Sequence, residues 1–482
     1  MIELSKALYP DISRPTPKII QFGEGNFLRA FFDWQIDLVN DLPSESWGVT
    51  VVRPIPGGVP FSLNEQDGLY HAVIRGVGPD GKAAVDIRLV KSILDEISVA
   101  ENYEAFLALA HNPDYQVIVS NTTEAGIVFD EKCGFDDKPP SSFPAKLTRL
   151  LWERFKACNG DATGGFQILP CELIDDNAGA LKRCVEQYIA LWKLDPAFKS
   201  WVEKAVFFYN TLVDRIVPGF PRDEADKLYA ELGMIDRFLV AAERFYLFVI
   251  ERKPGQPALL IPFEKAGLEV IVTEDIRPYK ERKVAILNGG HTALAPLALL
   301  GGVETVGEAM KNDELRRYLD ELFKDEIMPY ISLPPKESEA FAAEVLRRFE
   351  NPFIRHLWYD ISLNSIAKFK ARVLPRMLAC FDKTRKAPRH MCLSLAAWLL
   401  FYLGRHPHAA KFPPRDSDDV LATMKKLAAI IDPDELVDAF LLEKTFWDDA
   451  FSSDELRTGV KAAYKELVAV NGNTLVFLDK TV

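Results

Sequence analysis

The apolar pattern of this 482-residue chain changes character near residue 280. From about Pro17 to Asp275, short apolar runs of β type alternate with helical patterns, which is typical of a parallel sheet with crossover helices. Beyond about Arg282 the β-type runs almost disappear and helical periodicity takes over. We therefore predict an α/β chain in which a doubly wound sheet domain, residues 1–277, is followed by a mainly α-helical domain, residues 278–482.

Several runs in the first half have the length and composition of strands. Five are expected in the parallel sheet: residues 18–22, 48–52, 115–121, 166–171 and 206–212. Residues 70–77 and 83–90 flank the sequence Gly-Pro-Asp-Gly and predict an antiparallel insertion, because glycine supplies the positive φ that a tight turn needs. Two further strands are expected at residues 259–263 and 268–272.

Composition and charge restrict the partners of the chain. With 48% apolar and 27% charged residues, the chain resembles a packed globular protein. Its net charge of −12 would repel a nucleic-acid backbone, so no nucleic-acid partner is expected. The six cysteines lack the spacing of zinc or redox motifs, so we expect reduced thiols and no metal.

The sequence shows no secretory signal and no membrane span. The start, MIELSKALYP, has no basic region followed by an apolar stretch. The longest apolar run, residues 391–404, falls short of the roughly 20 residues that cross a bilayer, and it predicts a buried helix. We therefore expect a cytoplasmic protein with no membrane partner.

A glycine-containing turn follows the first predicted strand. Gly23 and Gly25 would let the chain turn tightly and bring its backbone N–H groups up to a pyrophosphate at a helix N-terminus. Leu28 replaces the third glycine of the dinucleotide fingerprint, and Arg53 stands where an acidic ribose partner is expected. The turn thus allows either a dinucleotide-binding, Rossmann-like domain or an ordinary strand–turn–helix.

A second motif lies where the two patterns meet. At about 100° per residue on a helix, Lys283, Asn288 and His291 share one side, within an arc of roughly 140°. Gly289 and Gly290 weaken that helix, so it could be bent or kept open for a ligand. A domain-boundary helix with a solvated lysine and a capping asparagine would explain the same residues.

These motifs resemble the polyol-specific long-chain, or mannitol dehydrogenase, family of NAD-dependent oxidoreductases. The family signature is a lysine, an asparagine five positions on and a histidine three further, which Lys283, Asn288 and His291 match. Within the family the likeness is to the uronate-reducing branch. The matching stretches are residues 21–38, 51–54, 62–70, 170–174, 210–224, 283–294 and 351–375.

The resemblance implies hydride transfer between NAD and a keto-uronate, interconverting D-tagaturonate and D-altronate in hexuronate catabolism. Lys283 would be the acid/base, while Asn288 and His291 would hydrogen-bond the substrate carbonyl oxygen. The expected cofactor-binding residues are Phe22, Gly23, Gly25, Asn26, Phe27, Arg53, Asn121 and Thr122. The expected substrate-binding residues are Asp214, His356, Lys368 and Arg372.

One departure from the family pattern leaves alternatives open. Mannitol-type members carry Cys-Asp-Asn after the fourth main strand, whereas this chain has Cys171, Glu172 and Leu173, so the second oxyanion donor is in question. Asp214 could equally pair with Arg215. A fructuronate (mannonate) reductase or a polyol dehydrogenase would use the same scaffold. A non-catalytic NAD(H)-sensing protein would keep the glycine turn without needing the lysine, asparagine and histidine together.

Overall fold

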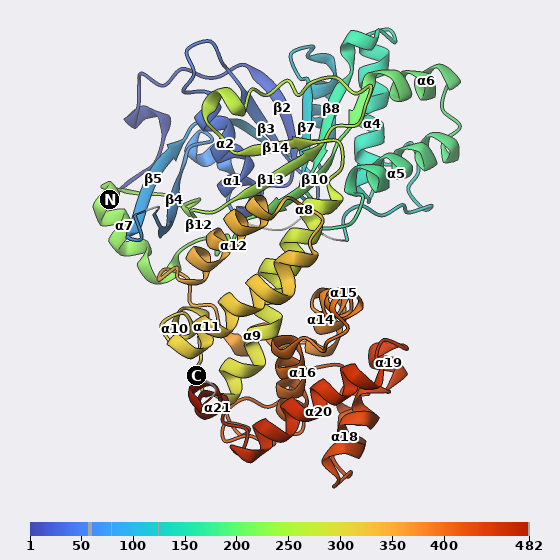
Figure 1. The fold of residues 1–482 in the computed structure, drawn as a ribbon. Coiled ribbons are helices and arrows are strands. Elements are labelled where there is room, and N and C mark those ends of the chain that lie inside the picture. The colour runs from blue at the N-terminus through green and yellow to red at the C-terminus, as the bar shows by residue number, and fades with distance from the viewer. Residues whose placement is uncertain (56–59, 79, 124, 481–482) are drawn as a thin grey trace. The chain divides into compact units, whose positions relative to one another are not determined.

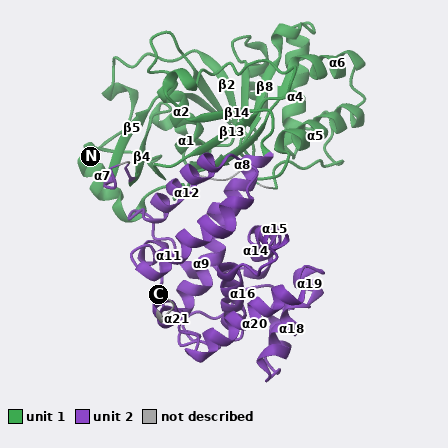
Figure 2. Ribbon diagram, viewed as in Figure 1, with its two compact units in different colours: residues 1–76, 84–276 green, residues 77–83, 277–482 purple. Residues whose placement is uncertain are grey.

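The computed structural model describes residues 1–55, 60–78, 80–123 and 125–480. Two compact units make up the chain, one of residues 1–76 and 84–276 and one of residues 77–83 and 277–482 (Figure 2). Pro79, inside the predicted turn between residues 77 and 83, lies outside the described residues.

A six-stranded parallel sheet forms the centre of the first unit (Figure 1). Its strands, in spatial order, are β6 (Ile93–Ser98), β3 (Gly48–Arg53), β2 (Pro17–Phe22), β7 (Val117–Ser120), β8 (Phe166–Pro170) and β9 (Val206–Phe208). Both faces are covered, so the inner strands β3, β2, β7 and β8 are largely apolar and buried, and their side chains alternate between two core clusters, whereas the edge strand β6 carries Asp95 and Glu96. The predicted doubly wound α/β sheet is confirmed.

The strand order reverses between β2 and β7. From β2 the chain builds outward through β3 and β6, and then β7, β8 and β9 follow on the other side of β2. In sheets of this kind, ligands bind outside the carboxyl ends of the strands at such a switch point. The glycine turn after β2 and residues 121 and 122 after β7 come from these two strands.

Helices cover the sheet on both sides. They are α1 (Asn26–Ala30), α2 (Phe32–Val39), α3 (Tyr103–Ala108), α4 (Phe143–Ala157), α5 (Asn177–Leu191) and α6 (Pro196–Ala205), whereas α7 (Ala225–Leu232) packs against strands β4 and β5 of a smaller sheet. Phe31, Phe32 and Ile36 of the α1–α2 region enter one core cluster. Leu147 and Leu151 of α4 enter the other, on the opposite face. The two clusters explain why a single sheet buries apolar side chains on both sides.

Three smaller sheets complete the first unit. One joins β12 (Val240–Glu243), β4 (Tyr70–Val77) and β5 (Ala83–Val90). A second joins β10 (Asn210–Asp214), β13 (Leu247–Glu251) and β14 (Val270–Thr273), and a third pairs β1 (Ile2–Glu3) with β11 (Met234–Ile235). Strands β1, β6, β11, β12 and β13 were not predicted from the sequence.

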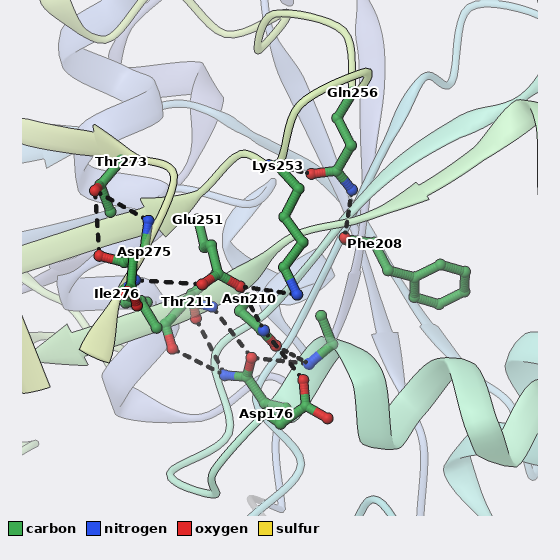
Figure 3. A network of polar contacts seen from close by, with 12 residues as sticks. Asp176, Phe208, Asn210, Thr211, Glu251, Lys253, Gln256, Thr273, Asp275 and Ile276 are labelled. Carbon is green, nitrogen blue, oxygen red and sulfur yellow. Dashed lines mark hydrogen bonds and ion pairs between the residues drawn. The ribbon is translucent and has the colours of Figure 1, made fainter.

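The strand predicted over residues 206–212 is wrong as a single strand. β9 belongs to the six-stranded sheet and β10 pairs antiparallel with β13. At the break, the Asn210 amide donates to Asp176 at 3.1 Å and to Glu251 at 2.8 Å, and Gln256 donates to the Phe208 carbonyl at 2.9 Å (Figure 3). These side-chain bonds hold the chain where it leaves one sheet for another.

The strand predicted over residues 259–263 does not form. The side chain of Gln167 accepts a hydrogen bond from the Leu260 N–H at 2.9 Å and donates to the Ala258 carbonyl at 2.7 Å. Pro262 has no N–H to add to a ladder. A buried glutamine side chain therefore holds this segment in place of a neighbouring strand.

The second unit is helical, as predicted. Its described helices are α8 (Arg277–Arg282), η7 (Lys283–Asn288), α9 (Gly289–Leu300), α10 (Val306–Ala309), α11 (Asp313–Glu321), η8 (Leu322–Ile327), η9 (Met328–Tyr330), α12 (Pro335–Phe349), α13 (Trp358–Ile361), α14 (Ser365–Arg372), α15 (Leu374–Thr384), α16 (Arg389–Tyr402), α17 (Asp418–Leu427), α18 (Pro433–Leu441), α19 (Lys444–Trp447), α20 (Asp454–Ala469) and α21 (Thr474–Lys480).

Helix α16 lies in the interior of this unit, packed against α9 and α20. Every residue from Met391 to Tyr402 is buried, which confirms the predicted buried helix. The indole N–H of Trp398 donates to the Thr292 carbonyl at 3.0 Å and so ties α16 to α9. Among the residues that the structure describes, no helix is long and apolar enough to cross a membrane.

Candidate active site

The turn between β2 and α1 requires glycine at position 23. Gly23 has φ +111°, and a Cβ atom there would lie 2.8 Å from the Asn121 carbonyl oxygen. Gly25 caps α1, and a Cβ atom built on it would meet nothing within 4 Å. Phe22 anchors the turn, since its carbonyl accepts the Asn121 N–H at 3.1 Å. The turn therefore passes close to the end of β7 while the backbone at Gly25 stays open to approach.

The remaining predicted cofactor residues lie around these two strand ends. Asn121 donates its amide to the Cys171 carbonyl at 2.7 Å. On α1, Asn26 accepts a hydrogen bond from Arg29 at 2.5 Å, and the ring of Phe27 stacks on Phe31 at 4.9 Å. The structure thus brings the predicted turn and the end of β7 together at the switch point.

Arg53, at the end of β3, belongs to an ion-pair network beside the turn. Its guanidinium donates to Glu96 at 2.7 Å and to the Phe61 carbonyl at 3.0 Å, and it lies 3.8 Å from the carboxylate of Glu24. Burial raises the pKa of Glu96, while the positive charge of Arg53 opposes that rise. Arg53 therefore faces two carboxylates of the protein itself.

Glu172, where the sequence departs from the family pattern, is hydrogen-bonded to residues of the protein itself. Its buried carboxylate accepts hydrogen bonds from the Ser120 hydroxyl at 3.0 Å and from the Thr122 N–H and hydroxyl at 3.0 and 2.9 Å. Burial raises its pKa. Leu173 has no polar side chain and is 60% exposed. Glu172 thus links the ends of β7 and β8 and orders Thr122.

Asp214 is the last residue of β10, in the first unit. The neighbouring Arg215 is buried, and within the described chain it donates to the carbonyls of Glu243 at 2.8 Å and Ala30 at 2.7 Å and lies over the Trp34 ring. Burial lowers the pKa of Arg215 to about 9. Arg215 is thus held by two backbone carbonyls and an aromatic ring, and the pairing of Asp214 with Arg215 stays a prediction.

In the second unit, the segment that carries the lysine and asparagine is a π-helix. It spans Lys283–Asn288 and continues directly into α9. A π-helical hydrogen bond joins residues five apart, so Lys283 and Asn288 lie about one turn apart. The angle between their side chains around the helix axis is therefore smaller than in a regular α-helix. A Cβ atom on Gly290 would lie 2.7 Å from the Phe323 ring, so this glycine permits close packing against η8.

Three polar atoms near this segment are buried without a hydrogen-bond partner among the described residues. They are Oδ1 of Asn288, Nε2 of His291 and Nε1 of Trp358. The His291 ring stacks on Phe349 at 4.1 Å and meets the rings of His356 and Trp358 edge to face, at 5.0 and 6.0 Å. Buried polar atoms normally have partners, so an enclosure with three open ones points to a polar ligand.

The surroundings of His291 are cationic. Burial lowers its pKa well below the ordinary value, and His356, Arg348, Arg372 and Lys368 lower it further. The pKa of His356 is also lowered, first by burial and then by the charge of Arg348. His291 is therefore neutral near pH 7, with one ring N–H to donate, in a region where an anion would be stabilised.

Lys368 and Arg372 lie one helical turn apart on α14. The ammonium group of Lys368 donates to the Ile361 carbonyl at 2.9 Å, and Arg372 makes a 3.5 Å contact with the Thr292 hydroxyl. Neither forms an ion pair with a carboxylate of the described residues. Burial lowers the pKa of each. The negative charge of Asp416 acts on Lys368 without forming an ion pair, and partly buried cations with no carboxylate in contact favour an anionic ligand.

Arg372 also lines a cavity of about 270 Å³ in the second unit. Three other cationic side chains line it, Arg277, Lys280 and Arg376, and of these Arg376 pairs with Glu281 at 2.5 Å. A larger cavity of about 360 Å³ lies between α3 and α4 in the first unit and contains none of the predicted site residues.

Sequence reasoning missed three residues of the His291 enclosure: Arg348, Phe349 and Trp358. Trp358 lies inside a stretch that matched the family, residues 351–375, and this was a usable signal. Arg348 and Phe349 end an ordinary amphipathic helix, and their pattern gives no hint of a site.

Comparisons with known proteins cover both units. Residues 17–260 match the family model described as the mannitol dehydrogenase Rossmann domain, and residues 275–468 match the mannitol dehydrogenase C-terminal domain. The altronate oxidoreductase of Enterobacter sp. (strain 638) is 46% identical over 479 residues, covering 96% of this chain and 98% of that relative. The altronate oxidoreductase of Klebsiella pneumoniae (strain 342) is 47% identical over 451 residues, covering 92% of each.

Two solved structures share the fold over nearly the whole chain. D-sorbitol dehydrogenase in substrate-free form superposes with a TM-score of 0.81 at 23% identity, covering 99% of this chain and 100% of that one. The Pseudomonas fluorescens mannitol 2-dehydrogenase ternary complex with NAD and D-mannitol gives a TM-score of 0.70 at 20% identity, covering 100% and 99%. At these sequence identities the structural similarity shows the fold alone.

Proposed function

The chain belongs to the mannitol dehydrogenase family, and from this premise we propose that it is an NAD-dependent oxidoreductase that interconverts D-altronate and D-tagaturonate. Relatives 46% and 47% identical over more than nine-tenths of the chain are altronate oxidoreductases. The observation that carries the proposal is the pair of unpartnered buried atoms on Asn288 and His291 in cationic surroundings. Such a site suits a polar, anionic substrate.

The glycine turn fits a dinucleotide. Gly25 leaves open space beside its backbone, and the turn lies at the switch point between β2 and β7. When bound, NAD accepts a hydride from the alcohol or returns one to the ketone. The residues that would hold it are Phe22, Gly23, Gly25, Asn26, Phe27, Arg53, Asn121 and Thr122.

Lys283 is the proposed acid/base. During oxidation of the alcohol its amine takes the hydroxyl proton, and during reduction its ammonium group protonates the developing alkoxide. The π-helical turn that places Asn288 one turn from Lys283 would let both side chains reach the same substrate oxygen.

Asn288 and His291 are proposed to hold that oxygen. The buried Asn288 atom without a partner is Oδ1, which accepts a hydrogen bond from a substrate hydroxyl, whereas the Nδ2 amino group of the same side chain is the proposed donor to the reacting oxygen; the neutral imidazole of His291 keeps one ring N–H. Donors already fixed in place stabilise an alkoxide without reorganising during the reaction. The packing of His291 against Phe349 fixes the direction of its ring.

Lys368 and Arg372 are the proposed carboxylate ligands, with His356 beside them. Both cations lie on α14 without a carboxylate partner in the described chain, so a uronate carboxylate would supply the missing charge. Asp214 is proposed as a substrate residue from the resemblance of residues 210–224 to the family. A neutral polyol would leave the two cations unpaired, which disfavours it as the natural substrate.

Steady-state assays with a panel of sugar acids and polyols test this function. We expect the highest kcat/KM with altronate and NAD⁺, followed by mannonate, and a much lower value with mannitol. A higher kcat/KM with mannonate or mannitol would transfer the assignment to a fructuronate reductase or a polyol dehydrogenase. Absence of turnover with every substrate, together with tight NADH binding, would favour an NAD(H)-sensing protein.

A further inference from the structure

Trp358 is a fully buried tryptophan whose indole N–H has no partner. It begins α13 with 0% exposure, and its backbone N–H donates to the Glu304 carbonyl at 3.0 Å. Its side-chain Nε1, by contrast, forms no hydrogen bond within the described residues. A buried N–H without a partner costs free energy, so native structures rarely keep one that no ligand or water meets.

Other buried tryptophans of the chain do not share this property. The indole of Trp398 donates to the Thr292 carbonyl at 3.0 Å and that of Trp447 to the Phe440 carbonyl at 3.0 Å. The indole of Trp201, in the first unit, donates to the Asp161 carbonyl at 2.9 Å. Trp358 therefore differs from these three buried tryptophans, because its indole N–H has no hydrogen-bond acceptor among the described residues.

Trp358 lies beside His291, a residue of the proposed substrate site, and this position can explain its unpartnered N–H. Its ring meets the His291 ring edge to face, with centroids 6.0 Å apart and planes at 76°. His291 and Asn288, one helical turn before it, also carry buried atoms without partners. Trp358 and His291, on two separate segments, thus have rings in contact and each carries a buried polar atom without a partner, and the proposed function already assigns His291 to the substrate.

We propose that the indole N–H of Trp358 donates a hydrogen bond to a hydroxyl oxygen of the bound substrate, on a carbon next to the one that reacts. This rests on the proposed function, which gives the reacting oxygen to Asn288 and His291 and the carboxylate to Lys368 and Arg372. An indole can only donate, so it needs an oxygen acceptor, and the acceptors that remain on a sugar acid are its other hydroxyl groups. Trp358 is then a substrate-binding residue that selects for a hydroxyl at that carbon.

Trp358→Phe keeps an aromatic ring and removes the N–H. A bond made equally to substrate and transition state affects KM and leaves kcat unchanged. We expect KM for altronate to rise five- to tenfold, kcat to stay within about twofold, and the Kd for NADH to stay the same. The melting temperature of the free enzyme should not fall by more than a few degrees, because no protein hydrogen bond is lost.

Trp201→Phe is the matched control, since it removes a buried indole N–H that is already bonded to the protein. It should lower the melting temperature and leave KM unchanged. If Trp358→Phe instead lowers the melting temperature and leaves KM unchanged, the N–H meets a structural water and the proposal is overturned.

A second measurement uses the wild-type enzyme. Altronate with NADH forms a complex that cannot react, because both partners are reduced. In ¹⁵N-indole NMR spectra, the Trp358 resonance should move downfield when this complex forms, while the Trp201 resonance stays in place. The Trp358 resonance is assigned from its loss in Trp358→Phe, or in Trp358→Tyr if the first variant does not fold. An unmoved resonance overturns the proposal.

The test stays informative if the proposed substrate is wrong. The substrate panel is measured first on the wild-type enzyme, and Trp358→Phe is then compared on whichever sugar acid or polyol the enzyme oxidises best. Failure with altronate alone refutes the proposed function, whereas an unchanged KM for the best substrate refutes the role of Trp358.

Discussion

Replacing Arg372 by methionine tests whether this guanidinium binds the substrate carboxylate. Methionine keeps most of the side-chain volume and removes the charge. In the free enzyme Arg372 makes one long contact, 3.5 Å to the Thr292 hydroxyl, and no ion pair with the described residues, so the variant breaks little of the protein's own structure. Its effect should therefore be on the substrate.

The size of the effect follows from the kind of bond lost. A hydrogen bond to a charged group contributes about 1.5–3 kcal/mol. At about 1.4 kcal/mol per tenfold change, kcat/KM for altronate should fall by roughly ten- to 150-fold. Altritol, the uncharged polyol with a hydroxymethyl group in place of the carboxylate, should lose less than about threefold. The loss for altronate should also shrink as salt is added, because ions screen the charge.

Arg376→Met is the matched control. Arg376 lines the same cavity, but its charge is already paired with Glu281 at 2.5 Å, so its loss should change kcat/KM for altronate by less than about threefold. Lys368→Met should behave like Arg372→Met, with a KM for altronate at least about tenfold higher. Equal losses on altronate and altritol would refute the carboxylate-binding role of the α14 cations.

Three further predictions concern the acid/base, the cofactor and the stability of the helical unit. Lys283→Ala should lower kcat by at least about a hundredfold, the lower range for a general acid/base, with NADH binding by fluorescence titration nearly unchanged; near-normal turnover would remove Lys283 from the mechanism. NADH should give a higher kcat/KM than NADPH, because Arg53 is already bound to Glu96 at 2.7 Å and Glu24 lies 3.8 Å away, where a 2′-phosphate would be repelled; the reverse preference would refute this reading. Burial lowers the pKa of His390, but hydrogen bonds to Glu326 and Glu321 outweigh it and leave the pKa raised. The stabilisation by these bonds should therefore be complete below the ordinary pKa of about 6.5 and be lost as pH rises through the higher folded value, so the melting-temperature difference between wild type and His390→Gln should shrink above neutral pH. A difference that does not vary with pH would contradict the assigned ion pairs.

Most of the parallel strands could be predicted because their residues are apolar on both faces, whereas β6, which contains Asp95 and Glu96, could not. Val49, Val51 and Val52 of β3 and Val117, Ile118 and Val119 of β7 form runs that only a covered sheet can bury. The strand β13 was missed although Phe248, Val249 and Ile250 form a similar buried apolar run; its antiparallel pairing with β10 joins residues far apart in the sequence. The break between β9 and β10 depends on Gln256 and Glu251, whose role in holding Phe208 and Asn210 no local pattern reveals.

The candidate site was predictable in part, because some of its residues are close together in the sequence. Lys283, Asn288 and His291 lie in one short segment, and their spacing alone brings them to one side of a helix. The π-helical form of residues 283–288 could not be predicted from periodicity, because Gly289 and Gly290, which follow it at the start of α9, indicated a bend without specifying the hydrogen-bond pattern. Arg348 and Phe349 reach the site only because the end of α12 folds back onto α9, which is a tertiary contact.

The π-helical turn has a consequence for how the chain length of this segment can vary. A π turn spans one residue more than an α turn, so deleting one residue between positions 283 and 288 would restore a regular helix. The deletion removes the extra residue of the turn, so α9 would face almost the same way relative to α8, and His291 would stay on the ring of Phe349. What would be lost is the five-residue spacing that sets Lys283 and Asn288 one turn apart. A one-residue deletion in this segment should therefore abolish activity while the helical unit keeps its packing.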